Sequence, residues 1–258
     1  MANEKFFTFL GIVIVLLVQG CAQQNENAQN AGNSQTQNNA NSNSGNGLSE
    51  MQKVSFTTED GIKISANYWP LKSNKGVVLL HMLGRTKETW QGFPEKLNKA
   101  GFNAMAIDMR GHGESEGGDF RSFTTKQWMD VLKDIKAAKE FLIKKGVDAD
   151  NVYLAGGSIG ANLALNYAAQ DSNIKKIVLL SPGLDYRGIA TMPSMQRYKE
   201  AVFLASSSED VQSFDGTKQL YAAAKGSREI KEYGNAGHGT NMLGKNNLDE
   251  YIIAWLKK

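Results

Sequence analysis

From Met51 to its end, the chain alternates apolar runs of strand length with longer amphipathic segments, and this alternation limits the folds open to it. Runs in the middle of the series, such as VVLL within 76–81, are continuously apolar, which is typical of parallel strands covered on both faces. The first two runs, joined through EDG at 59–61, predict a β-hairpin. Eight strands are predicted, at 53–58, 63–69, 76–81, 103–108, 152–156, 176–181, 201–206 and 229–234.

The amphipathic segments between these runs predict helices. Strand, helix and strand in repetition favour right-handed crossovers, and therefore an α/β fold with a mostly parallel central sheet and helices on both faces. Ligands of such sheets bind beyond the carboxyl ends of the strands, so polar residues at those positions are the candidates for function. Helices are predicted at 88–100, 125–145, 159–170, 214–225 and 246–257.

The first twenty residues have the pattern of an export signal. Lys5 precedes an apolar run at 6–18, which is too short for the roughly 20 residues of a membrane-spanning helix. VQGC, which ends at Cys21, is similar to the bacterial lipobox, and this resemblance implies that residues 1–20 are removed and Cys21 is lipidated. An uncleaved anchor and secretion with a free thiol are the alternatives. All three place the chain outside the cytoplasm, and lipidation predicts attachment to a membrane of the bacterial cell envelope.

Residues 21–50 predict a disordered tether between that anchor and a domain at 51–258. Fourteen of the 29 residues at 22–50 are Asn or Gln, and such a stretch has little apolar surface to bury. The formal net charge of the chain is +3, without a block of Lys or Arg that resembles a nucleic-acid-binding tail. We therefore expect no nucleic-acid partner.

The sequence GGSIG places Ser158 in a G-x-S-x-G pattern between the strand predicted at 152–156 and the helix predicted at 159–170. This is the context of a nucleophile elbow. In such a sharp turn, side chains at Gly156 and Gly160 would collide with neighbouring backbone. The turn lifts the Ser158 hydroxyl above the sheet and points a helix N-terminus toward it, which favours negative charge there. An ordinary loop serine is the alternative.

Three further motifs follow strands: LLHMLGR from 79, DMRGHGES from 108 and NAGHG from 235. Together with GGSIG, they make the chain from about Lys53 onward resemble the α/β-hydrolase superfamily, and within it the small, lidless esterases and dienelactone-hydrolase-like members. The family order of nucleophile, acid and histidine implies Ser158, Asp210 and His238.

The resemblance also implies a role for each group. His238 accepts the proton of Ser158 and returns it to the leaving group, while Asp210 fixes the tautomer of the imidazole. The backbone N–H of Ile159 and a second N–H, on Met82 or Leu83, form the oxyanion hole. Where relatives have His-Gly, this chain has His-Met, which predicts an acyl pocket narrowed by a thioether.

Other residues compete for these roles. Asp185 follows the strand predicted at 176–181, where some relatives carry the acid, and Glu209 is adjacent to the favoured aspartate. His81 and His112 are alternative bases, although the resemblance implies that they support loops. In DMRGHGES, the polar residues are expected to brace the site through a turn; they are Asp108, Arg110 and Ser115.

The resemblance implies a serine hydrolase that acts on small carboxylic esters, or on related thioesters and lactones, through an acyl-enzyme and without a metal or organic cofactor. About twenty residues separate the strands predicted at 176–181 and 201–206, which is too few for a multi-helix cap, so little or no cap is expected. The alternatives are a membrane-tethered binding module on the same scaffold, and an acyltransferase or peptidase with the same nucleophile.

Overall fold

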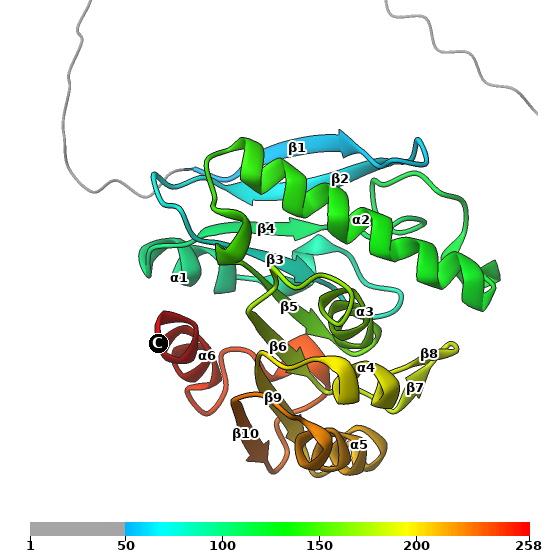
Figure 1. The fold of residues 1–258 in the computed structure, drawn as a ribbon, viewed down its shortest axis with the longest axis vertical. Helices are drawn as coiled ribbons and strands as arrows, with labels where there is room; N and C mark the ends of the chain where they lie inside the picture. The colour runs from blue at the N-terminus through cyan, green and yellow to red at the C-terminus, as the bar shows by residue number, and fades with distance from the viewer. Residues whose placement is uncertain (1–49) are drawn as a thin grey trace, which may run out of the picture. The chain divides into compact units, whose positions relative to one another are not determined.

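An eight-stranded sheet organises residues 50–258, the part of the chain that the computed structural model describes. Its strands run in the order β1-β2-β4-β3-β5-β6-β9-β10, from the top of Figure 1 to the bottom. The pairs β1/β2 and β2/β4 are antiparallel, and every later pair is parallel. The mostly parallel sheet of the prediction is thereby confirmed. The strands are β1 Gln52–Thr57, β2 Lys63–Trp69, β3 Gly76–Leu80, β4 Asn103–Ile107, β5 Val152–Gly157, β6 Lys176–Leu180, β9 Ala201–Ser207 and β10 Arg228–Tyr233.

Helices cover both faces of the sheet, because alternate residues of its central strands belong to two separate cores. Val78 and Leu80 of β3 pack with α2 and α3, whereas Val77 and Leu79 pack with α1 and α6. This two-sided burial is the reason that the central strands read as continuous apolar runs. The helices are α1 Phe93–Lys99, α2 Thr125–Lys144, α3 Ile159–Ala168, α4 Met192–Arg197, α5 Val211–Ala223 and α6 Leu248–Lys257.

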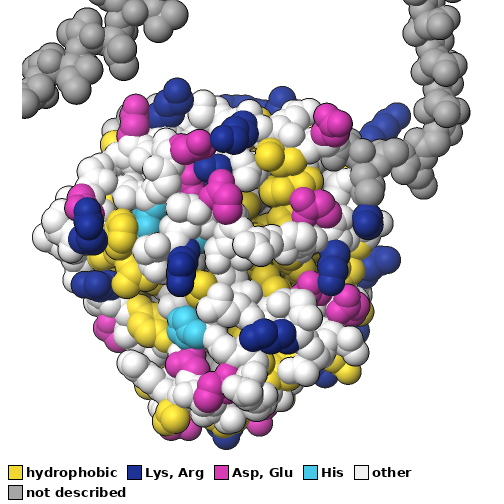
Figure 2. All heavy atoms as spheres, turned by 180° about the vertical axis from the view of Figure 1, so that it is seen from behind, with side chains coloured by type: hydrophobic (Ala, Val, Ile, Leu, Met, Phe, Trp, Pro, Cys, Tyr) yellow, Lys and Arg dark blue, Asp and Glu magenta, His cyan; other side chains and the backbone are white. Residues whose placement is uncertain are grey.

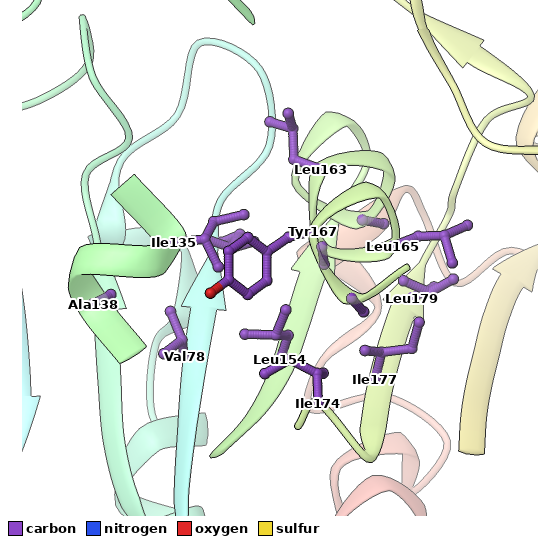
Figure 3. Packing of buried hydrophobic residues seen from close by; sticks show 14 of the residues in the cluster. Val78, Ile135, Ala138, Leu154, Leu163, Leu165, Tyr167, Ile174, Ile177 and Leu179 are labelled. Atoms are coloured by element: carbon purple, nitrogen blue, oxygen red, sulfur yellow. The ribbon is translucent and has the colours of Figure 1, made fainter. Parts of the chain in front are cut away.

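The core on the α3 side fixes the helix that follows Ser158. Figure 3 shows Tyr167 of α3 among Val78 and Leu154 of the sheet and Ile135 of α2. Every residue of α3 is buried. A helix enclosed in this way cannot shift without disturbing close-packed neighbours, so the position of its first turn is well defined.

The prediction of one helix at 88–100 is wrong. The segment forms a 3₁₀ turn at Lys87–Trp90, and α1 begins only at Phe93. Gly92 between them has a φ of 70°, a conformation that cannot continue a right-handed helix. Pro94, in the first turn of α1, suits a new start.

The connection between β6 and β9 holds elements that the sequence did not predict. Two short strands, β7 Asp185–Tyr186 and β8 Ile189–Ala190, form a hairpin, and the six-residue helix α4 follows it. Strands of two residues carry no readable periodicity. Residues 181–200 contain no further helix, so this connection carries no multi-helix cap.

The export signal predicted at 1–20, the lipidation site Cys21 and all but the last residue of the predicted tether lie outside the described residues. From residue 50 to residue 258, no helix has both the length and the apolar character that crossing a bilayer requires.

Candidate active site

Ser158 occupies a strained turn between β5 and α3. Its backbone has φ 54° and ψ −122°, a region that residues with side chains rarely adopt and that costs about 1–3 kcal/mol. Its N–H donates to the carbonyl of Leu180 at 2.8 Å, and its own carbonyl accepts from the N–H of Ala161 at 2.9 Å. These bonds, made at the end of β6 and in the first turn of α3, hold the serine at the carboxyl edge of the sheet.

The two glycines around Ser158 are required by close backbone contacts. A Cβ at Gly156 would lie 2.3 Å from the carbonyl oxygen of Gly160. A Cβ at Gly160 would lie 2.5 Å from the carbonyl oxygens of Leu80 and His81. The end of β3 is thus pressed against the first turn of α3, and neither backbone can yield to a methyl group.

Asp210 and His238 meet at the same edge, although 28 positions separate them. Asp210 precedes α5, and its Oδ2 lies 2.5 Å from Nδ1 of His238. The next residue, Gly239, donates its N–H to the Ser181 hydroxyl at 2.9 Å, and a Cβ on it would lie 3.5 Å from the Ser158 nitrogen. The histidine loop therefore runs beside the elbow. With Nδ1 facing the carboxylate, Nε2 is the ring nitrogen available to the serine.

The competing carboxylates have other partners. Glu209 accepts hydrogen bonds from the Ser207 hydroxyl and from the N–H groups of Asn235 and Gly237, which together lower its pKa to about 2. It thereby holds the loop that leads to the histidine. Asp185 accepts from the N–H of Gly188 at 2.7 Å and closes the β7–β8 hairpin. Within the described chain, neither carboxylate hydrogen-bonds a histidine.

The predicted oxyanion donors lie on two segments that flank the elbow. Ile159 is the first residue of α3, where backbone N–H groups have no acceptor within the helix. The loop after β3 carries Met82 and Leu83. The Met82 carbonyl accepts from Nδ1 of His81 at 2.7 Å, and Cβ atoms added at Gly157 and Gly239 would lie 3.2 Å and 2.5 Å from the Met82 side chain. The thioether therefore fills space between the elbow and the histidine loop.

His81 and His112 hold loops, as the resemblance implied. His81 is fully buried, and its Nε2 accepts the N–H of Met109 at 3.1 Å. His112 accepts the N–H of Gly84 at 3.4 Å and stacks on Phe120 with ring centroids 4.0 Å apart. Burial lowers the pKa of His112, and it lowers the pKa of His81 to about 3. The ring of His81 is consequently neutral, with its hydrogen on Nδ1.

The neutral His81 gives a testable pH dependence of stability. Between pH 6.5 and pH 3 the unfolded chain binds a proton at this residue that the folded chain does not, so stability falls as the pH falls. The free energy of unfolding changes with pH, and this one group contributes a slope of up to about 1.4 kcal/mol per pH unit. Urea unfolding at pH 7, 6, 5 and 4 measures it. His81→Asn keeps a donor toward Met82 but does not titrate, so its slope should be shallower; equal slopes would contradict this account.

The DMRGHGES segment braces the site through buried ion pairs. Asp108 accepts from the backbone N–H of Lys87 at 2.8 Å and from its Nζ at 2.6 Å. Arg110 bonds Asp134 through Nε and Nη2, and the Ser115 hydroxyl donates to the Asp108 carbonyl at 2.7 Å. Sequence reasoning missed Lys87, because nothing in its neighbours distinguishes a buried lysine from a surface one.

A polar hollow of about 610 Å³ lies beside the histidine loop, and Ser158, Asp210 and His238 are not among the residues that line it. One wall is the loop after β3, from Gly84 to Gln91, and the other is the segment after the histidine, from Thr240 to Leu243. Figure 2 shows histidine on one face of the molecule, with hydrophobic, basic and acidic side chains around it. Among residues 50–258, no three His, Cys, Asp or Glu side chains form a group that could hold a metal ion.

Comparison with known proteins relates this geometry to a family. Residues 72–203 match the family described as serine aminopeptidase, S33. The chain is also similar to a multifunctional-autoprocessing repeats-in-toxin protein of Vibrio cholerae, with 30% identity over 131 residues. That match covers 48% of this chain but only 2% of the toxin.

Solved structures share the fold. A structure of DcsB in complex with its substrate analogue has a TM-score of 0.73 at 15% identity, and the alignment covers 81% of this chain and 99% of that one. An esterase from Pyrococcus furiosus has a TM-score of 0.67 at 20% identity. This alignment covers 81% of this chain and 90% of the esterase chain. Together with the sheet order, these likenesses establish the α/β-hydrolase fold.

Proposed function

The chain belongs to the serine aminopeptidase S33 family and is an α/β serine hydrolase, and on this premise we propose that it cleaves small carboxylic esters through Ser158, His238 and Asp210. The observation that carries the proposal is the contact between Asp210 and His238 at the sheet edge where Ser158 is held in a strained turn. A binding module on this scaffold has no need of such strain, which costs folding free energy.

The reaction proceeds in two halves. Oγ of Ser158 attacks the ester carbonyl while Nε2 of His238 takes its proton, and Asp210 stabilises the imidazolium. The carbonyl oxygen becomes an oxyanion, which accepts from the N–H of Ile159 and from the loop after β3. His238 then protonates the departing alcohol, leaving an acyl-serine. Water attacks this ester, with His238 as base, and the carboxylic acid leaves as the proton returns to Oγ.

The partners of the nearby carboxylates favour an ester over a peptide with a free N-terminus. An aminopeptidase needs a carboxylate for the substrate ammonium group. Glu88 is the one carboxylate that lines the hollow, and its Oε1 lies 3.3 Å from Nζ of buried Lys87. Asp210 faces the histidine, and Glu209 holds the histidine loop. Each of these three carboxylates thus already has a partner, although the Glu88 side chain is 56% exposed.

Substrate class is tested with the full chain on p-nitrophenyl acetate, butyrate and octanoate, beside alanine p-nitroanilide. We expect kcat/KM for p-nitrophenyl acetate or butyrate to exceed that for the anilide by about a hundredfold or more, because each of the three carboxylates near the site already has a partner. Faster anilide cleavage would favour a peptidase. Absence of turnover with every substrate would favour the binding module, and ester formation with an added alcohol in preference to hydrolysis would favour an acyltransferase.

We also propose that the hydrolase works in the bacterial cell envelope, anchored to a membrane through lipidated Cys21. The lipobox-like VQGC and the polar segment that follows it support this location. In a bacterial host, the wild-type chain should partition into detergent and Cys21→Ser should remain in the aqueous phase. Equal partitioning of the two chains would reject lipidation.

A further inference from the structure

The end of β6 is bonded to both the elbow and the histidine loop. The carbonyl of Leu180, the last residue of the strand, accepts the N–H of Ser158 at 2.8 Å. The hydroxyl of the next residue, Ser181, accepts the N–H of Gly239 at 2.9 Å. Because Gly239 directly follows His238, two consecutive residues of one strand end hold the proposed nucleophile and the proposed base.

The bonds on the other side of the histidine lead to a different strand. Three N–H groups that precede it donate to side chains at the end of β9 and in the turn after it; these groups belong to Asn235, Ala236 and Gly237. Asp210, which contacts the imidazole, follows the same strand. The bond from Gly239 to Ser181 differs from these, because it joins the histidine loop to β6, whose last residue holds Ser158.

The backbone of Ser181 has a conformation that favours glycine. Its φ is 49°, where a residue with a side chain meets a steric cost. Its side chain is fully buried, and its N–H donates to the carbonyl of Ala205 at 2.8 Å, next to the ladder between β6 and β9. Glycine would make this backbone bond without the cost. The feature that only a side chain supplies here is the hydroxyl that accepts the N–H of Gly239.

Loss of that hydroxyl would leave the N–H of Gly239 without its acceptor in a buried place. A buried N–H without a partner is costly, so the peptide group after His238 would shift toward another acceptor or toward water. Proton transfer from Ser158 requires the two side chains within hydrogen-bond reach, and a displacement of about 1 Å can lower a rate by about a hundredfold.

We propose that Ser181 is a positioning residue for acyl transfer, whose hydroxyl fixes the peptide group after His238 and thereby the place of the imidazole relative to Oγ of Ser158. The inference rests on the proposed hydrolase function and adds to it a residue that acts through the base.

Two substitutions remove the hydroxyl and differ in their effect on the backbone. Ser181→Ala keeps a side chain at positive φ, whereas Ser181→Gly relieves the strain, so the glycine variant should melt a few degrees above the alanine variant. For p-nitrophenyl butyrate, we expect kcat to fall roughly tenfold or more in both variants, because both lose the same bond. KM should change less than about twofold, and labelling of the full chain by a fluorophosphonate should slow with kcat.

The matched control is Ser206→Ala. Ser181 and Ser206 directly follow Leu180 and Ala205, which are paired across β6 and β9, and both serine side chains are fully buried. The Ser206 hydroxyl, however, has no hydrogen-bond partner within the described chain. Its removal should leave kcat and the labelling rate at their wild-type values.

A kcat that follows the melting temperature, so that Ser181→Gly regains wild-type turnover and Ser181→Ala does not, would overturn the inference. Wild-type kcat in both variants would also overturn it, as would a change confined to KM or an equal loss in Ser206→Ala. A wild-type chain that neither hydrolyses esters nor reacts with the fluorophosphonate would instead reject the proposed function, and the role of Ser181 with it.

Discussion

Replacing Ser158 with alanine is expected to lower kcat/KM for p-nitrophenyl esters by about a thousandfold or more, because the proposed acyl-enzyme could no longer form. Alanine adds no atoms to the turn and leaves its backbone bonds to Leu180 and Ala161 in place. The variant should therefore fold like the wild type. Steady-state hydrolysis of p-nitrophenyl butyrate, with circular dichroism to check folding, measures this.

The control for this loss is Ser172→Ala, at an exposed serine in the loop between α3 and β6. It should retain wild-type turnover. Were Ser158→Ala to keep more than about a tenth of the wild-type kcat/KM, attack by this serine would be excluded as the route of catalysis.

The second large effect concerns the acid. Asp210→Asn should lower kcat by about a thousandfold or more, because an amide in place of the carboxylate neither fixes the reactive tautomer of His238 nor stabilises its charged form. Asp185→Asn should lower kcat by no more than a few fold, since an amide oxygen can still accept the N–H of Gly188. The two variants are compared on one ester under identical conditions.

These paired variants decide between two of the three acids that the sequence left open. A larger loss in Asp185→Asn than in Asp210→Asn would contradict the assignment of the acid. If both variants were fully active, the contact between Asp210 and His238 would have only a structural role.

The strands of the sheet could be predicted closely from the sequence, each within one residue of its observed ends. The reason is physical: a strand buried on both faces needs an unbroken apolar run, and the turns at its ends need glycine or polar residues. The elbow was predictable for a similar reason, because the contacts of Gly156 and Gly160 exclude every side chain.

The remaining features depend on contacts between distant parts of the chain. Gly92 divides a segment whose apolar spacing alone predicts one helix, because its positive φ is visible only in the structure. The choice of Asp210 over Glu209 depends on which of two adjacent side chains turns toward His238. The β7–β8 hairpin is built from two-residue strands, which leave no pattern in the sequence.

The most direct test of the account is to map where a fluorophosphonate attaches to the wild-type chain. The reagent phosphonylates a serine only where a base removes its proton and donors stabilise the oxyanion. Peptide mass spectrometry should find one adduct per chain, on Ser158, and its formation should slow sharply in Asp210→Asn. An adduct on another residue, or none at all on a folded chain, would contradict the claim that Ser158, His238 and Asp210 act together.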